Sequence, residues 1–108
     1  MKKMKNKRKK LANPKDILVT REEHYFKSPI ENALKNHFMP VISVYKNPKD
    51  YPKKYVARLH IVNAQGGSPT SYVFIADTLR EVEEARPNDL TAYGRFPDDD
   101  PCIIQSWF

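Results

Sequence analysis

The stretch Tyr55-Val56-Ala57-Arg58-Leu59-His60-Ile61-Val62 alternates in character from one residue to the next. The members at odd positions are all apolar or aromatic, whereas those at even positions include Arg58 and His60. Successive side chains of a β-strand point to opposite faces of a sheet, so this pattern predicts a strand with one buried face and one partly wet face. The chain is therefore expected to be built around a sheet.

Shorter β-rich runs on both sides of this stretch predict four more strands. They are Val41–Tyr45, Ser71–Ala76, about 90–96 and about 102–108. The turns between them are short, for instance Gln65–Pro69, which favours antiparallel pairing of consecutive strands. Ile17–Val19 could add an edge strand or only pack on the body. The large apolar side chains of Trp107 and Phe108 are expected to dock their segment in the sheet.

Two helix starts are also visible. Ser28-Pro29-Ile30-Glu31 combines an N-cap hydroxyl, a proline suited to the first helical position and a glutamate that can reach back to the cap. It predicts a helix at about 29–38 that ends at Pro40. Thr78-Leu79-Arg80-Glu81 is a second capping box and predicts a short helix at about 79–85.

The elements follow one another in the order α-β-β-β-α-β-β. This order predicts an α+β fold, with a small antiparallel sheet of about five strands and two short helices on one face. A length of 108 residues fits one domain. We divide it into a disordered, flexible basic N-terminal arm (1–16), an N-terminal extension with one helix (17–40) and an antiparallel α+β core (41–108).

The positive charge is concentrated in the arm. The whole chain holds 19 Lys and Arg against 13 Asp and Glu, but from residue 11 onward the count is 12 against 13. Blocks of like charge usually stay disordered and often meet an anionic partner. The arm could neutralise several phosphates of DNA or RNA, or it could be a solubilising tail. Its cations are Lys2, Lys3, Lys5, Lys7, Arg8, Lys9 and Lys10.

Several classes of protein are disfavoured. The longest apolar stretches, such as Tyr72–Ala76, are far shorter than the roughly 20 residues that a membrane helix requires. No apolar segment of a signal peptide follows the basic start. The single cysteine, Cys102, excludes an internal disulfide and a cysteine-based zinc site. We therefore expect a cytoplasmic protein in a reducing setting.

No catalytic, metal or cofactor site is predicted. Asp98-Asp99-Asp100 lacks the spacing of a calcium loop and is explained by a solvated turn between prolines. The three histidines share no metal-ligand spacing. A metal-free ribonuclease would need an acid, a base and cations on one face. Arg58 and His60 do share a strand face, and Lys46 and Arg95 could join them, but we expect no enzyme.

A second surface feature is the loop Lys46–Tyr55, which concentrates tyrosines, prolines and lysines. Rigid loops rich in tyrosine are typical of binding surfaces. The alternative is that Tyr51 and Tyr55 pack over the edge of the sheet. The residues of the body that we predict to bind a partner or nucleic acid are Lys49, Tyr51, Lys53, Lys54, Arg58 and Arg95.

Three segments together resemble a known group of proteins. They are Tyr45–Leu59 (YKNPKDYPKKYVARL), Ala76-Asp77-Thr78-Leu79 and Asp99–Trp107 (DDPCIIQSW). They are similar to a family of very small, uncharacterised bacterial proteins that occur in mobile-element or phage contexts. The resemblance covers about residues 41–108, omits the arm and the first helix, and implies no activity and no catalytic residues.

Two functional hypotheses follow. The first is a non-catalytic binding protein, an adaptor or inhibitor of a protein or nucleoprotein partner, which uses an exposed sheet edge or the loop Lys46–Tyr55. The second is direct, sequence-independent DNA or RNA binding by the arm and by basic residues of the sheet. Neither hypothesis requires a cofactor, and the oligomeric state stays open.

Overall fold

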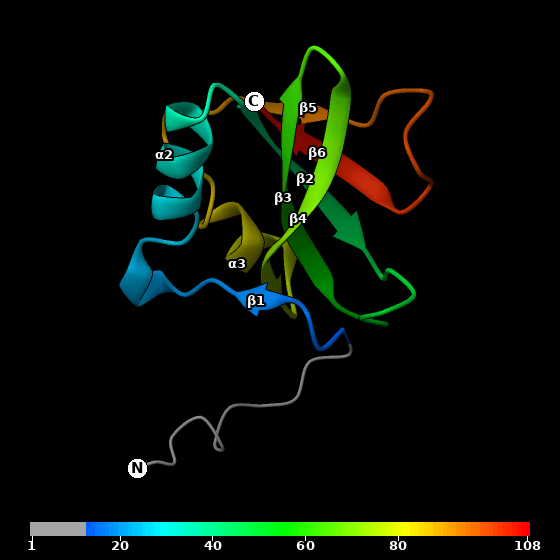
Figure 1. Cartoon of the computed structure of the whole chain (residues 1–108). Coiled ribbons are helices and arrows are strands. Elements are labelled where there is room, and N and C mark those ends of the chain that lie inside the picture. The colour runs from blue at the N-terminus through cyan, green and yellow to red at the C-terminus, as the bar shows by residue number, and fades with distance from the viewer. Residues whose placement is uncertain (1–12) are drawn as a thin grey trace.

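The computed structural model describes residues 13–108. A six-stranded sheet runs through the molecule, and both α-helices, α2 (Lys27–Lys35) and α3 (Leu79–Glu83), lie on one side of it (Figure 1). The predicted α+β class is confirmed. We call the side without α-helices the open face of the sheet.

The sheet contains one strand more than predicted and is mixed rather than purely antiparallel. Its strands are β1 (Ile17–Leu18), β2 (Met39–Lys46), β3 (Tyr55–Asn63), β4 (Gly66–Ala76), β5 (Ala92–Gly94) and β6 (Ile103–Trp107), in the spatial order β1-β4-β3-β2-β6-β5. The pairs among β2 to β6 are antiparallel, but β1 runs parallel to β4. The Val19 N–H donates to Val73 O at 2.8 Å, so this short segment covers an edge that β4 would otherwise expose.

The alternation in β3 is resolved as the sequence predicts. Leu59 pairs with Ile42 and Ala57 with Val44, and these four side chains are buried on the helix side. Trp107, which pairs with Ile42 from the other flank, is also completely buried. The same core cluster contains Val19 and Phe26 from the segment before β2, and Val82 from α3. Residues 17–40 therefore contribute to one core with the rest of the described chain.

Helix α2 begins and ends earlier than predicted. Its N-cap is Phe26, whose side chain is completely buried, and the Ile30 N–H donates to Phe26 O at 2.9 Å. Core packing of Phe26 thus overrides the Ser28 cap. At the other end His37 has φ 65°, and the Phe38 N–H donates back to Ala33 O at 2.9 Å. This is the hydrogen-bond pattern of a Schellman motif, so the helix stops well before Pro40, which lies within β2.

Helix α3 has the predicted capping box. The Glu81 N–H donates to Thr78 Oγ1, and the Thr78 N–H donates to Glu81 Oε1, both at 3.2 Å. The segment between β1 and α2 contains a shorter 3₁₀ helix, η1 (Arg21–Glu23), which Thr20 caps.

Strand β4 is longer than predicted, because the hairpin turn is tighter than the sequence suggests. Asn63 pairs with Gly66, whose φ of 123° suits glycine, so only two residues form the turn. Pro69 lies inside the strand, where it cannot donate to the ladder. The register shifts between Arg58 and His60 at this point, and Thr70 Oγ1 donates to Leu59 O at 2.7 Å instead.

The last two strands are shorter than predicted, since Arg95–Pro101 forms an exposed turn rather than extending the sheet. Within residues 13–108, no helix is long and apolar enough to cross a membrane.

Candidate functional site

The open face holds a network of three side chains that come from distant parts of the chain. Asp16, just before β1, accepts two hydrogen bonds from Arg58 of β3, at 2.8 and 2.9 Å. The Tyr51 hydroxyl donates to Asp16 Oδ2 at 2.7 Å, and Arg58 also donates to Thr70 O at 2.8 Å. We call Asp16, Tyr51 and Arg58 the Asp16 network. Asp16 belongs to the segment that the sequence assigns to the arm, but it is buried.

Asp16 and each of its two partners stabilise one another's ionisation state. Burial alone would raise the pKa of Asp16, but the hydrogen bonds from Arg58 and Tyr51 outweigh it and lower that pKa. The hydrogen bond to Asp16 raises the pKa of Arg58. Burial and the bond to Asp16 together raise the pKa of Tyr51 to about 12. The Arg58 side chain is only 15% exposed and its charge is already paired with Asp16. Its guanidinium is therefore poorly accessible to a phosphate.

The loop between β2 and β3 is closed by its own hydrogen bonds. Asn47, with φ 55°, accepts the Lys53 N–H on its side-chain oxygen at 2.7 Å and donates its own N–H to Lys54 O at 2.7 Å. The Tyr51 ring is only 7% exposed and packs with Val56 and Val73 in a second, smaller cluster. Tyr51 therefore packs the loop against the sheet, and little of its side chain is accessible to a partner.

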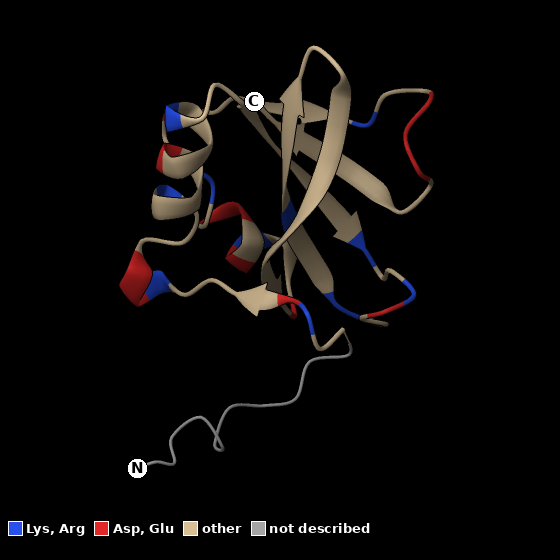
Figure 2. Ribbon diagram, viewed as in Figure 1, with Lys and Arg blue, Asp and Glu red and all other residues tan. Residues whose placement is uncertain are grey.

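The lysines of this loop differ in their surroundings. Lys49 and Lys53 are exposed, as is Lys46 at the end of β2. Lys54 forms an exposed ion pair with Asp77. In Figure 2 the ribbon of the loop between β2 and β3 is mostly blue, whereas the turn between β5 and β6 is red. The predicted arm cations Lys2, Lys3, Lys5, Lys7, Arg8, Lys9 and Lys10 lie outside the described residues.

Tyr45 and His60 form a second polar pair on the open face, with 3.3 Å between the hydroxyl and Nε2. Burial, and then the nearby charge of Arg58, lower the pKa of His60. Burial raises the pKa of Tyr45. At neutral pH the pair is therefore a phenol and a neutral imidazole, and the cation beside it is paired with Asp16.

The aspartates of the turn between β5 and β6 organise its backbone. Asp99 Oδ2 accepts the Phe96 N–H at 2.9 Å, and Asp100 Oδ1 accepts the Cys102 N–H at 2.8 Å. Arg95 donates to Asp99 O at 2.8 Å, so its guanidinium lies against an acidic turn. No group of three or more His, Cys, Asp or Glu side chains in residues 13–108 is arranged to hold a metal ion.

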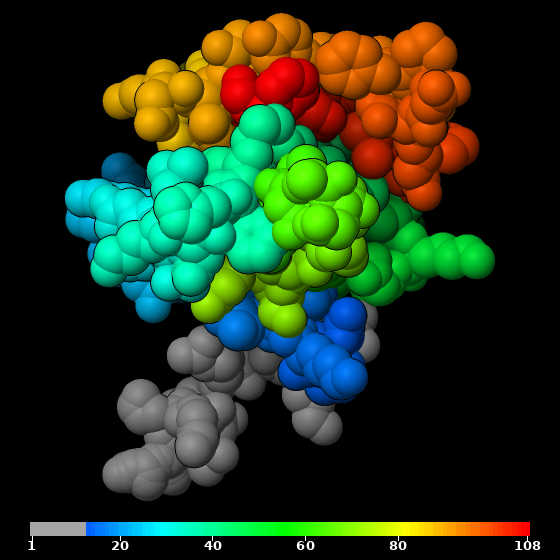
Figure 3. Space-filling model, turned by 45° about the horizontal axis from the view of Figure 1, so that its top comes forward, coloured from blue at the N-terminus to red at the C-terminus, as the bar shows by residue number. Residues whose placement is uncertain are grey.

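Strand β5 is the outermost strand on its side of the sheet. Figure 3 shows the segment that contains it (orange) against β6 (red) along the upper border of the molecule. Thr91 and Phe108 exchange both backbone hydrogen bonds, at 3.1 and 3.2 Å. In an antiparallel ladder such pairs alternate, so Tyr93 also bonds toward β6 and the backbone groups of Ala92 and Gly94 point outward.

Beside this edge lie three exposed aromatic rings, Tyr93, Phe96 and Phe108, which we call the aromatic triad. Tyr93 and Phe108 stack with centroids 4.5 Å apart and planes 22° apart, and Phe96 lies 6.4 Å from each. Their exposed fractions are 41%, 43% and 40%. Tyr93 pairs with Ser106, so these rings extend the open face rather than the core.

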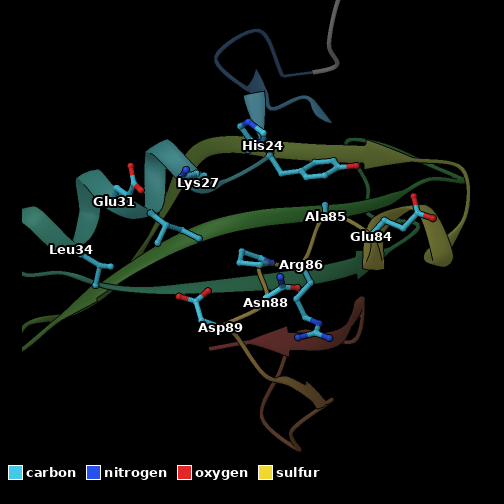
Figure 4. A pocket seen from close by; sticks show the side chains of 12 residues that line it. His24, Lys27, Glu31, Leu34, Glu84, Ala85, Arg86, Asn88 and Asp89 are labelled. Carbon is cyan, nitrogen blue, oxygen red and sulfur yellow. The ribbon is translucent and has the colours of Figure 1, made fainter. Parts of the chain in front are cut away.

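A hollow of about 520 Å³ lies on the other side of the sheet, between α2 and the segment after α3. Ile30 and Leu34 border it from α2, and Ala85 borders it from the opposite wall (Figure 4). Its charged lining contains both signs, so charge favours no class of ligand there. These charged residues are Lys27, Glu31, Glu84, Arg86 and Asp89.

No family model, curated protein or solved structure matches this chain. The resemblance to small bacterial proteins seen in Tyr45–Leu59, Ala76–Leu79 and Asp99–Trp107 therefore stays a prediction.

The predicted binding residues differ in how accessible they are to a partner. Lys49 and Lys53 are exposed on the loop, Lys54 is ion-paired, and Tyr51 and Arg58 belong to the Asp16 network. Sequence reasoning missed the aromatic triad. A signal was present for two of the three rings, since Tyr93 and Phe96 adjoin the turn residues Gly94 and Pro97.

Proposed function

We propose that this protein is a non-catalytic binding protein, an adaptor or inhibitor that holds a protein or nucleoprotein partner at the β5 edge. The observation that supports this most is the aromatic triad beside a strand edge whose backbone groups point outward. Aromatic side chains are enriched at the centres of interfaces, and open edges take up extended peptides by backbone pairing.

The two features complement each other energetically. Strand β5 has only three residues, so backbone pairing by itself would be weak. Aromatic anchors commonly supply much of the affinity of an interface. The mutual stacking of Tyr93 and Phe108 restricts both rings before a partner arrives, which lowers the entropy lost on binding.

Selection from a displayed library of random peptides tests this proposal. Peptides selected on the full chain should bind a Tyr93→Ala/Phe108→Ala variant at least tenfold more weakly, because the aromatic anchors are gone. The control is Leu34→Ala, which removes a still more exposed apolar side chain from α2 and should leave the affinity unchanged. If the selected peptides bind all three proteins alike, the β5 edge is not the binding site.

A second candidate is direct DNA or RNA binding. The exposure of Lys46, Lys49 and Lys53 at one end of the sheet favours it. The affinity for a DNA duplex should then fall steeply with salt, and deleting residues 2–10 should flatten that dependence. A salt dependence that the deletion leaves unchanged would show that residues 2–10 do not contact the nucleic acid.

The setting that we propose is the cytoplasm. It rests on the single cysteine of the sequence, because disulfides are characteristic of oxidising compartments.

A further inference from the structure

We propose that the β5 edge takes up an extended, cationic segment of a partner protein, which adds to the sheet as a seventh strand. This inference rests on the proposed function and specifies the chemistry of the partner. It combines the backbone of β5, the charge around it and the aromatic triad.

The backbone of β5 offers a defined docking register. Ala92 and Gly94 each present one N–H and one C=O outward, since Tyr93 uses its own groups toward β6. A strand added here forms up to four backbone hydrogen bonds without breaking any existing one. Ala92 and Gly94 are both exposed, and the space beside Gly94 is open.

The charge around β5 selects the partner. Residues 88–100 contain four aspartates and one arginine, a formal charge of −3, although the whole chain is at +6. Asp89 lies before β5, and Asp98 to Asp100 lie after it, so both ends of the edge are acidic. A second copy docked edge to edge would bring four more aspartates against these four. A cationic strand instead meets acidic residues at both ends of the edge.

The aromatic triad suits the same partner. Side chains of an added strand alternate between the two faces, so every second one projects over the open face beside Tyr93 and Phe108. Lysine and arginine pack their aliphatic stems on aromatic rings, and their charges are attracted to the ring faces. The acidic turn adjoins the rings, since Asp99 Oδ2 accepts the Phe96 N–H at 2.9 Å, so its carboxylates can pair with the ends of such side chains.

Three labelled octapeptides test the inference by fluorescence anisotropy on the full chain: alternating Thr-Arg, Thr-Gln and Thr-Glu. We expect the Thr-Arg peptide to bind at least tenfold more tightly than the Thr-Gln peptide, and the Thr-Glu peptide to bind most weakly. Asp98→Asn and Asp100→Asn should each weaken Thr-Arg binding about two- to fivefold, as for exposed charge pairs. Glu31→Gln, which removes an exposed charge from α2, is the control without effect.

The backbone register is tested separately. Ala92→Pro removes an outward N–H and no ladder bond, so it should abolish binding of the Thr-Arg peptide while the circular dichroism spectrum stays unchanged. If Ala92→Pro does not fold, the inference is tested by the binding of the Thr-Arg peptide to Asp98→Asn and Asp100→Asn. Equal affinity for the three peptides would overturn the inference that the partner segment is cationic. The proposed function would still stand if the peptides selected from the library require Tyr93 and Phe108. Sedimentation that shows a dimer of the full chain, lost on Ala92→Pro, would make a second copy the occupant and overturn the inference.

Discussion

The loop between β2 and β3 and the segment around β5 are alike in composition but differ in structure. Each combines a tyrosine, at least one proline and a cluster of like charges. In the loop, Tyr51 is 7% exposed and its hydroxyl is bound to Asp16. Around β5, Tyr93 is 41% exposed and stacks on a neighbouring ring that is itself exposed.

The difference depends on what the rest of the chain places against each tyrosine. Asp16 lies 35 residues before Tyr51 and reaches it only because β1 docks on β4. Strand β5 is the last in the sheet, and nothing in residues 13–108 covers its outer side in the spatial order of strands. Aromatic residues in the sequence therefore indicate segments that could form a binding surface. The topology of the sheet decides which of their side chains remain accessible.

The largest expected effect is on the buried tyrosine. Tyr51→Ala removes a ring from the smaller cluster, and we expect it to lower the free energy of unfolding by about 4 kcal/mol. Tyr93→Ala removes a ring that water already reaches, and it should cost about 1 kcal/mol, mainly from the lost stack. Denaturation by urea measures both. Equal losses would mean that the two tyrosines do not differ in the way described.

A second test compares a buried ion pair with an exposed one. Arg58→Met leaves the Asp16 carboxylate, which is only 1% exposed, without its cation and should cost about 3 kcal/mol. Lys54→Met breaks the exposed pair with Asp77 and should cost less than about 1 kcal/mol. Adding Asp16→Asn to Arg58→Met should recover part of the loss in the same urea measurement. If Arg58→Met costs no more than Lys54→Met, the Asp16 network does not hold the N-terminal segment in place.

The fold was largely predictable from local patterns. Alternation in β3 and the capping box at Thr78 are short-range signals, and both were correct. The end of α2 was misplaced because His37 adopts a left-handed conformation that histidine seldom takes. The parallel pairing of β1 with β4 was not predictable, because it joins residues more than 50 positions apart with only two residues of strand.

The candidate site was less predictable than the fold. Lysines were expected to be exposed, and Lys49 and Lys53 are, since their charge keeps them in water. Arg58 carries the same charge, but its accessibility depends on Asp16, 42 residues away. The aromatic triad depends likewise on β5 being an edge strand. Long-range pairing of strands thus determines both outcomes, and no local pattern encodes it.

A smaller effect is expected when only the hydroxyl of Tyr51 is removed. Tyr51→Phe loses one hydrogen bond to a buried carboxylate and should cost about 1.5 kcal/mol, whereas Tyr93→Phe should change the stability by less than about 0.5 kcal/mol. The pKa of Tyr51 is raised to about 12, above its ordinary value of 10.0. The folded state therefore holds this proton more tightly, and the stability it contributes is present below pH 10 and lost as the pH rises toward 12. Tyr51→Phe should remove this alkaline loss, and a loss that persists unchanged would assign it to another group.

The smallest effect concerns His60, which lies on β3 two residues after Arg58 and contacts Tyr45 on the open face. Burial and the charge of Arg58 lower the pKa of His60, so the folded state binds its proton less readily than the unfolded chain does. The stabilising contribution is therefore present above the unfolded pKa of about 6.5 and is lost as the pH falls through the lower folded value. Urea titrations between pH 8 and pH 5 should show this decline for the wild type and a flatter profile for His60→Gln. An identical slope in both proteins would show that His60 titrates alike in the folded and the unfolded chain, and the decline would then belong to another group.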